Sequence, residues 1–429
     1  MKNRLKLTKL EKSWILYDVG NSAFTLLVAT LLPIYFNALA TGAGIDENMY
    51  LSYWGYAGAI ATVIVAFIGP ICGTLSDRKG YKKPIFLLCV LLGVLGCAAL
   101  GLAKDWLVFL AIFIIAKVGF NGSLVFYDAM LPEITTQERM DDVSTQGYAW
   151  GYIGSVIPFV LCLVLVLAGG SFGLDQSTAM IVAFILTAVW WAVFTLPLTR
   201  QYKQTAYVER GAHPVADAFR QIANTFRKAK EQKHVFVYLI AFFFFINGVY
   251  TIIDMATAYG TDLGLDTTGL LLALLLTQIV AFPCAILFGR LSAKHDSAKL
   301  MKICIVCYAG ITLFAVFLVS QWQFWVLATL VGMFQGAIQA LSRSYLGKIV
   351  SAEQSGEFYG LMDICGKGAS FFGMTLVGFI NQITDGLEVT IFGLRLQNSN
   401  IAVSALVILF IIGYILFCKA DKLNKERMK

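Results

Sequence analysis

The sequence has little charge. Only 14% of its 429 residues are Asp, Glu, Lys or Arg, 58% are apolar, and the mean hydropathy is +0.74. Soluble proteins carry about 25% charged residues. A soluble chain of this length would divide into two or three domains with polar surfaces, and there are too few charges here to cover them. The composition therefore excludes an ordinary soluble protein and predicts that most of the surface faces lipid.

Histidine is also scarce, and the cysteines lie in unreactive surroundings. The three histidines (His213, His234 and His295) fall in or beside polar loops, so we predict neither a metal site nor a histidine-based triad. Most of the nine cysteines lie inside apolar stretches, where Cys serves as a small apolar residue. No nucleophile–base constellation and no Walker phosphate-binding loop is present. We therefore expect no enzyme, no cofactor and no ATP-driven pump.

Long apolar stretches dominate the chain. About 17–25 apolar residues suffice to cross a bilayer as a helix. We predict an all-α integral membrane protein with twelve transmembrane helices in two bundles of six. The basic start leads into a span too long for a signal peptide and without a cleavage site, so none is expected. The spans cover residues 14–40, 51–75, 84–103, 106–130, 143–168, 178–198, 234–259, 268–289, 301–320, 323–348, 357–381 and 399–418.

The basic residues predict the orientation. If both termini lie on one side, that side holds 28 of the 33 Lys and Arg residues, and the opposite loops hold only Lys104 and Arg395. Positive residues favour the cytoplasmic side, so both termini are expected in the cytoplasm of a multi-pass cell membrane protein. The net charge of +7 then reflects topology and anionic headgroups, and no nucleic acid partner is needed.

The chain divides at its middle. Residues 1–199 and 234–429 each hold six predicted spans, and residues 200–233 form a long basic connection. Within it, Phe219, Ile222 and Phe226 recur at helical spacing, which predicts a surface helix against the membrane or the bundle. Six-plus-six halves are common in secondary transporters, whose substrate site lies near the midplane between the repeats. We expect a monomer.

Polar residues inside the spans are candidates for function, because an ionisable group in a bilayer costs about 2.5–3.5 kcal/mol even on insertion scales. Asp18, Asn21, Ser22 and Thr25 share one face of the first span. This polar stripe can line a cavity or make helix–helix hydrogen bonds.

Two lysines lie near mid-depth in opposite halves. Lys117 is in the fourth span, followed by Asp128, and Lys367 is in the eleventh span, four residues after Asp363. Two cations at a central cavity would suit a carboxylate. Alternatively, each neutralises an internal acid: Lys367 or Arg343 with Asp363, and Lys117 with Asp128 if the helix bends. The two interpretations are compatible, because a substrate carboxylate can exchange with an internal counter-ion.

A polar turn carries a recognisable spacing. Gly73, Asp77, Arg78 and Gly80 occur in the run Gly-Thr-Leu-Ser-Asp-Arg-Lys-Gly-Tyr-Lys-Lys. This run resembles the loop between the second and third helices of major facilitator superfamily transporters. The resemblance implies a cytoplasmic gate, with Asp77 approaching a helix N-terminus in the other half. The matching loop that begins at Gly289 lacks the Asp, so the two halves are expected to latch unequally.

A narrower resemblance covers residues 14 to about 380 in collinear order. The stretches 14–24, 127–134, 144–154, 339–344 and 366–367 resemble the vacuole-effluxer, or autophagy-related permease, branch of that superfamily. The chain departs from the pattern at Val19-Gly20, where Trp-Ala is usual, at Asp128, where Asn is usual, and at Asn247, where Asp is usual. The last departure weakens a proton-coupling role at that position. Yeast-type members are implicated in amino-acid efflux, so the resemblance implies small polar metabolites as substrates.

The resulting hypothesis is a secondary transporter that moves a small polar, carboxylate-bearing metabolite by alternating access, with protons as a candidate coupling ion. The alternatives are a facilitator of lipids or other amphiphiles and a membrane sensor that transports nothing. The expected substrate contacts are Asn21, Lys117, Asn247, Gln339 and Lys367. The expected coupling or counter-ion residues are Asp18, Asp128, Asp363 and Arg343, and the expected gate residues are Gly73, Asp77, Arg78 and Gly80.

Overall fold

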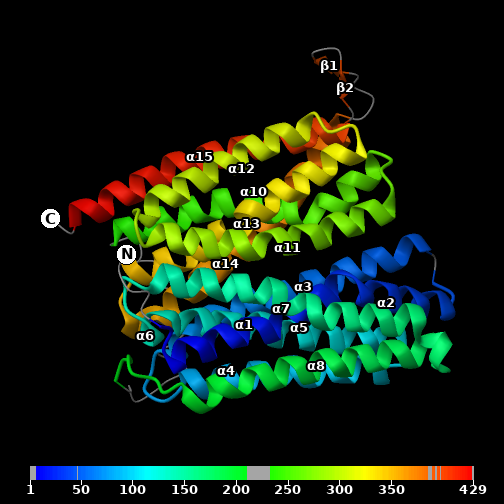
Figure 1. The fold of residues 1–429 in the computed structure, drawn as a ribbon, viewed down its shortest axis with the longest axis horizontal. Coiled ribbons are helices and arrows are strands. Elements are labelled where there is room, and N and C mark those ends of the chain that lie inside the picture. Colours follow the sequence, from blue (N-terminus) through cyan, green and yellow to red (C-terminus); the bar gives the residue numbers. More distant parts are fainter. Residues whose placement is uncertain are drawn as a thin grey trace. The chain divides into compact units, whose positions relative to one another are not determined.

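The computed structural model describes residues 6–45, 47–209, 232–384, 389–391, 394–396 and 398–427. Almost all of these residues are helical (Figure 1). The described strands, β1 (Val389–Ile391) and β2 (Leu394–Leu396), form one antiparallel hairpin with Val389 opposite Leu396. The all-α prediction is confirmed. The surface helix expected around Phe219 lies outside the described residues.

Eleven helical segments of the described chain are long and apolar enough to cross a membrane. The remaining predicted span, the eleventh (357–381), corresponds to α14, a 29-residue helix whose charged residues and glycines lower its hydropathy. Large apolar side chains are exposed along these helices; Phe67 is 74% and Leu102 76% exposed. Such a surface suits lipid rather than water.

The helices of the first half begin and end close to the predicted spans. They are α1 (Lys9–Ala29), α2 (Leu31–Gly42), α3 (Glu47–Ser76), α4 (Lys82–Ala99), α5 (Trp106–Ala129), α6 (Leu131–Ile134), α7 (Met140–Ala168) and α8 (Gln176–Gln201). Short 3₁₀ turns, η1 (Leu100–Leu102) and η2 (Gly169–Phe172), follow α4 and α7.

The second half contains α10 (Lys233–Asp262), α11 (Thr267–Ser292), α12 (Ser297–Val316), α13 (Gln321–Ile349), α14 (Ser355–Ile383) and α15 (Asn398–Arg427). A 3₁₀ turn, η3 (Ala352–Gln354), leads directly into α14. Aspartates cap several of these helices: the Asp266 carboxylate accepts from the backbone N–H of Gly269 at 2.7 Å, which satisfies one of the free donors of a first turn.

The first predicted span is two helices rather than one. α1 ends at Ala29 and α2 begins at Leu31, with Thr30 at φ −128° and ψ −71° between them. Pro33 has no N–H for the carbonyl of Ala29, and its ring clashes with that carbonyl in a continuous helix. The break follows from a single proline that the hydropathy pattern does not register.

The chain forms two compact units. Unit 1 comprises the described residues within 1–136, 150–219 and 352–360, and unit 2 those within 137–149, 220–351 and 361–429. The first residues of α7 therefore belong to unit 2, and the first residues of α14 belong to unit 1. Each unit thus includes the beginning of one helix from the other half of the sequence.

Unit 1 is built on paired helices. α1 packs along α8, and α5 lies against both α4 and α3 (Figure 1). The fully buried Trp191 of α8 packs against both Phe24 of α1 and Phe120 of α5, with ring centroids 5.7 and 5.8 Å away, and these two rings also contact each other at 5.3 Å. These aromatic contacts fix the spacing of α1, α5 and α8, which carry the candidate residues Asp18 and Lys117.

Unit 2 follows the same plan. α10 packs along α15, α11 along α13, and α12 against both α13 and α15 (Figure 1). The ring of Tyr345 on α13 lies 4.9 Å from that of Tyr238 in a tilted contact and 5.2 Å from that of Phe417 in an edge-to-face contact, joining α13, α10 and α15. The Tyr238 hydroxyl donates to the carbonyl of Ser342 at 2.7 Å, which gives this buried group a hydrogen-bond partner.

Candidate functional site

The loop between α3 and α4 holds the N-terminus of α14. Asp77 Oδ1 accepts from the backbone N–H of Gly356 at 2.7 Å, and Oδ2 accepts from that of Glu357 at 2.8 Å. Free N–H groups and the helix dipole make a helix N-terminus favourable for a carboxylate. The predicted approach of Asp77 to a helix N-terminus is confirmed.

The geometry of this loop requires glycine at two positions. A Cβ on Gly73 would overlap the carbonyl of Gly356, so only glycine lets α3 and α14 come this close. Gly80 has φ +82°, the left-handed region that L side chains rarely adopt, and its N–H donates to Gln204 Oε1 at 2.9 Å. The glycines of the motif therefore serve packing and turn geometry.

A buried lysine joins the parts of this loop. Lys82 is fully buried, and its Nζ lies 2.7 Å from Glu133 Oε1, 2.8 Å from Ser355 Oγ and 3.6 Å from Asp77 Oδ1. Burial raises the pKa of Asp77 to about 6, although Lys82 and the two backbone N–H groups pull it down. Buried ions need such close partners.

The start of the connection between the halves docks on the same loop. Gln204 Nε2 donates to the carbonyl of Ser76 at 2.9 Å, and the N–H of Val208 donates to the carbonyl of Asp77 at 2.7 Å. Arg78 forms an isolated parallel bridge with Val208 and is 6% exposed. Glu133 accepts from the N–H of Thr205 at 2.7 Å. The loop thus binds both α14 and residues 202–208.

A second cluster, in unit 2, joins the start of α7 to the end of α13. Ser344 Oγ donates to Asp141 Oδ1 at 2.6 Å, and Lys348 Nζ binds Asp141 Oδ2 at 2.5 Å. The Arg343 guanidinium donates to Ser144 Oγ and to its carbonyl, both at 2.9 Å, and lies 4.5 Å from the Tyr148 ring centroid. Arg343 is thereby fixed at the end of α13.

This second cluster differs in chemistry from the first. Gly289 of α11 lies where a Cβ would overlap Thr145 Oγ1 of α7, much as Gly73 approaches α14. The loop after α11 has no Asp at the matching position, and the carboxylate comes instead from Asp141 at the start of α7. Both clusters thus contain a glycine in close contact with a neighbouring helix. In the first cluster the carboxylate, Asp77, follows the glycine in the same loop, whereas in the second it belongs to the helix that the glycine contacts.

The polar stripe of α1 is largely buried in unit 1. Asp18, 7% exposed, accepts from the Tyr127 hydroxyl at 2.9 Å. Asn21, 3% exposed, donates to the carbonyl of Tyr17 at 2.9 Å. A Cβ on Gly151 of α7 would lie 2.8 Å from Ser22 Oγ, so the absence of a side chain at Gly151 lets α7 pack closely against α1. Thr25 is exposed.

Lys117 lies half-buried on α5. Its Nζ is 5.6 Å from the ring centroid of Phe113, one turn earlier. α5 continues without interruption to Ala129, so Asp128, eleven positions after Lys117, lies about 16 Å from it along the helix axis. Asp128, which is half-buried, is therefore too distant for the direct ion pair that a bent helix would have permitted.

The eleventh span places its two charges together. Lys367 and Asp363 form an i,i+4 ion pair on α14, with side chains 16% and 19% exposed. Gln339 of α13 is half-buried. Asn247 of α10 is fully buried and accepts from the Thr251 hydroxyl at 3.3 Å. A Cβ on Gly373 would overlap Asn247 Oδ1, so this amide packs against α14 within unit 2.

The fold is that of major facilitator transporters. The human organic anion transporter MFSD10 superposes with a TM-score of 0.71 at 15% identity, covering 95% of this chain and 99% of that one. A bacterial homologue of the iron transporter ferroportin, in an outward-facing state, gives 0.72 at 12% identity, covering 96% and 98%. The molecule is a multi-pass membrane protein of this class.

Sequence comparison defines the family within the class. The family model "Vacuole effluxer Atg22 like" matches residues 8–427, so the chain belongs to that family. An uncharacterized MFS-type transporter, YxiO of Bacillus subtilis (strain 168), is 37% identical over 416 residues, 96% of this chain and 94% of its own length. Autophagy-related protein 22 of Coccidioides immitis (strain RS) is 23% identical, covering 79% of this chain and 69% of its own. The chain is a secondary transporter of the major facilitator type.

Several residues of the two clusters were missed from the sequence, namely Lys82, Glu133, Asp141, Ser144, Gln204 and Lys348. Lys82 and Glu133 lie inside the matched motifs, so the motifs could have identified them. Asp141 has a weaker signal, an acidic residue in the first turn of a helix. Gln204 carries none, because its partners are backbone groups more than a hundred residues away.

Proposed function

We propose that the protein moves a small, polar, carboxylate-bearing metabolite, such as an amino acid, across the cell membrane by alternating access. The two halves, residues 1–199 and 234–429, are the proposed moving bodies, joined by the cytoplasmic connection 200–233. Protons are the proposed coupling ion, with Asp18 and Asp128 as the titrating carboxylates. Both termini lie in the cytoplasm and the working unit is a monomer.

One observation carries the substrate class: the Lys367–Asp363 ion pair inside a membrane helix. Both side chains are mostly, but not fully, buried. A lysine in the membrane needs a counter-ion, and its local Asp supplies one when no substrate is bound. A substrate carboxylate can take the place of Asp363, so the cation never loses its partner. This exchange makes Lys367 a substrate contact.

The other proposed substrate contacts follow from position. Lys117 adds a second cation from unit 1. Two cations suit a substrate with two anionic groups, or a single carboxylate that passes from one lysine to the other. Asn21, Asn247 and Gln339 supply amides on α1, α10 and α13. Asn21 and Asn247 are buried by the packing of α1 and α10. They can contact a substrate only if these helices rearrange during the transport cycle.

The two clusters at the helix ends are the proposed gates. Asp77, Gly73, Arg78 and Gly80 hold the start of α14 in unit 1, and Asp141 holds the end of α13 in unit 2. Arg343 stabilises the second gate through Ser144. Opening either gate separates a buried carboxylate, Asp77 or Asp141, from its hydrogen-bond partners. Because a partly separated buried charge is unfavourable, we propose that each gate is either closed or open, without stable intermediates.

The test is a thermal-shift screen of the purified protein in lipid nanodiscs, followed by counterflow in proteoliposomes. Amino acids and other carboxylates should raise the unfolding temperature of the wild type, since a ligand of the native state stabilises it. Lys367→Gln should weaken this effect by about tenfold or more, as expected for a lost charged contact. Lys104→Gln, at an exposed loop position, is the matched control.

Other outcomes would contradict the proposal. Stabilisation by carboxylate-free solutes alone would exclude the role of Lys367 as a carboxylate contact. Response to lipids alone would favour an amphiphile facilitator. Absence of counterflow for every solute, with unchanged stability of Lys117→Ala and Lys367→Ala, would favour a sensor.

A further inference from the structure

Unit 2 contains a cavity that the proposed transport path does not use. It has a volume of about 230 Å³ and lies among α10, α14 and α15, and Ala315 of α12 and Leu327 of α13 also line it. We call it the α10–α14–α15 pocket. It extends from Thr251 to Asp262 along α10, so it follows the last three turns of that helix.

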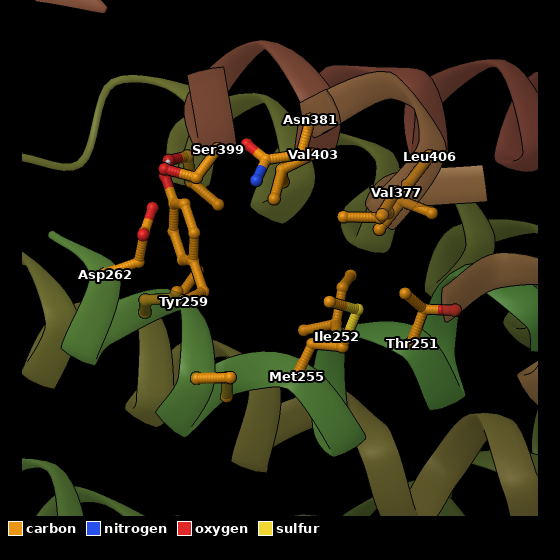
Figure 2. Close-up of a pocket in the computed structure, with 15 residues that line it drawn as sticks. Thr251, Ile252, Met255, Tyr259, Asp262, Val377, Asn381, Ser399, Val403 and Leu406 are labelled. Atoms are coloured by element: carbon orange, nitrogen blue, oxygen red, sulfur yellow. Dashed lines mark hydrogen bonds between the residues drawn. The ribbon is translucent and has the colours of Figure 1, made fainter. Parts of the chain in front are cut away.

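One end of this pocket is polar and carries unused hydrogen-bonding atoms. Ser399, only 8% exposed, has no hydrogen-bond partner for its Oγ among the described residues, and Asn381 has none for its Oδ1. Figure 2 shows Ser399, Asn381, Tyr259 and Asp262 at this end. A buried polar atom without a partner is unfavourable, so these two atoms favour a ligand that brings a polar group to this end of the pocket.

The wall around these atoms is already fixed. The Tyr259 hydroxyl donates to the carbonyl of Ala315 at 2.7 Å and accepts from Asn400 Nδ2 at 2.7 Å. The single O–H donor of Tyr259 is therefore used, so this hydroxyl does not donate to Ser399 Oγ. The free atoms of Ser399 and Asn381 remain available to a bound molecule.

The other end of the pocket is apolar. Ile252, Met255, Val377 and Leu406 converge there from α10, α14 and α15 (Figure 2). Ligand pockets typically combine such a surface with a few placed polar groups that fix orientation. The bound molecule must therefore have an apolar body and one polar end.

The polar end is rich in acceptors. Asn381 offers an amide oxygen, Ser399 a hydroxyl oxygen, and the exposed Asp262 at the end of α10 a carboxylate. An ammonium group has three donors and no acceptor. A carboxylate in its place would be repelled by the negative charge of Asp262.

We propose that the α10–α14–α15 pocket binds a primary alkylammonium group, its nitrogen at Ser399, Asn381 and Asp262 and its alkyl chain between Ile252 and Leu406. This site is separate from the proposed carboxylate site at Lys367. Two sources share the chemistry: a free amphiphilic amine and the ethanolamine headgroup of a membrane lipid.

The test uses the full-length protein in phosphatidylcholine nanodiscs, with hexylammonium, hexanol and hexanoate as probes. Hexylammonium should raise the unfolding temperature at lower concentrations than the other two probes. Ser399→Ala should weaken hexylammonium binding about tenfold, as for one lost hydrogen bond to a charged group. Ser404→Ala, on the same helix but outside the pocket, is the matched control.

Two further variants keep the test decisive if Ser399→Ala folds poorly. Asp262→Asn, at an exposed position, should remove the preference for hexylammonium over hexanol. Asn381→Leu should weaken hexylammonium and leave hexanol binding intact. Equal stabilisation by hexylammonium and hexanoate in the wild type, or equal losses in Ser399→Ala and Ser404→Ala, would overturn the proposal.

The lipid source is separated from the free amine by nanodisc composition. A fall in hexylammonium affinity when phosphatidylethanolamine replaces phosphatidylcholine supports a lipid headgroup as the occupant. Unchanged affinity supports a free amine. Because neither probe series depends on Lys367, the Lys367→Gln variant should bind hexylammonium as the wild type does, even where carboxylate binding is lost.

Discussion

At the scale of single residues, Asp77 is the acid whose environment is defined most completely. Its carboxylate accepts from two backbone N–H groups of α14, and Lys82 lies 3.6 Å away. Burial nevertheless raises its pKa to about 6, from an ordinary value of 3.8. The folded protein therefore holds this proton over a pH range in which the unfolded chain has released it.

The consequence is a pH dependence with a definite sign. Between about pH 4 and pH 6 the folded state binds more protons at Asp77, so the free energy of unfolding decreases as pH rises through this window. The full change is about 3 kcal/mol for a shift of this size. The unfolding temperature of the wild type should fall across the window relative to Asp77→Asn, which has no titrating group there. Parallel curves for the two proteins would contradict this expectation.

Lys82 gives a second prediction at this scale. It is fully buried and lies close to Glu133, Ser355 and Asp77. Lys82→Met leaves two buried carboxylates without their cation, which costs about 3–5 kcal/mol. The unfolding temperature in nanodiscs should fall clearly. Lys83→Met, at the next position and only partly buried, should change it little; equal losses would show that the ion cluster is unimportant.

At the scale of elements, the contact between α3 and the start of α14 depends on close approach. A Cβ on Gly73 would overlap the Gly356 carbonyl, and the neighbouring backbone cannot move without shifting a helix. Gly73→Ala should therefore destabilise the protein by about 1–3 kcal/mol through overpacking. Thermal unfolding measures this directly.

The matched control lies on the same helix. Gly55 of α3 is exposed, and a Cβ there meets no atom within 4 Å. Gly55→Ala should leave the unfolding temperature unchanged or raise it, because alanine favours the helix. If both substitutions have the same effect, the tight contact at Gly73 is not a source of stability.

Breaks between elements arise from local chemistry that periodicity alone does not show. Pro33 divides the first span into α1 and α2. In contrast, Pro70 lies inside α3 and Pro283 inside α11 without ending either helix. Neighbouring helices in a membrane protein can satisfy the carbonyl that a proline leaves free. The effect of each proline is thus decided by its surroundings.

At the scale of the whole molecule, charge distribution predicts the orientation. With both termini in the cytoplasm, 28 of the 33 cations lie on that side. A green fluorescent protein fused after Lys429 should fluoresce, and alkaline phosphatase fused there should be inactive. Phosphatase fused at Gly264, between α10 and α11, should be active. An active enzyme at the C-terminus would contradict the proposed orientation.

The sequence was sufficient for the fold class, the family and the identity of Asp77 as the acid that contacts a helix N-terminus. Hydropathy places the helices because each must satisfy its own backbone in lipid. The motif identifies Asp77 because its spacing is local. By contrast, Asp77 and Gly356 are separated by 279 positions and Lys348 and Asp141 by 207, and no local pattern connects such partners.

The remaining features depend on three-dimensional packing. The sequence by itself determined a basic, lipid-embedded, helical transporter, because apolar length and charge placement act locally on each span. Only the tertiary structure decided that Lys82 is buried among acids, that Asp141 supplies the second cluster's carboxylate, and that Ser399 and Asn381 face a cavity. Burial and hydrogen-bond satisfaction depend on which distant helices meet, and that is settled when they pack.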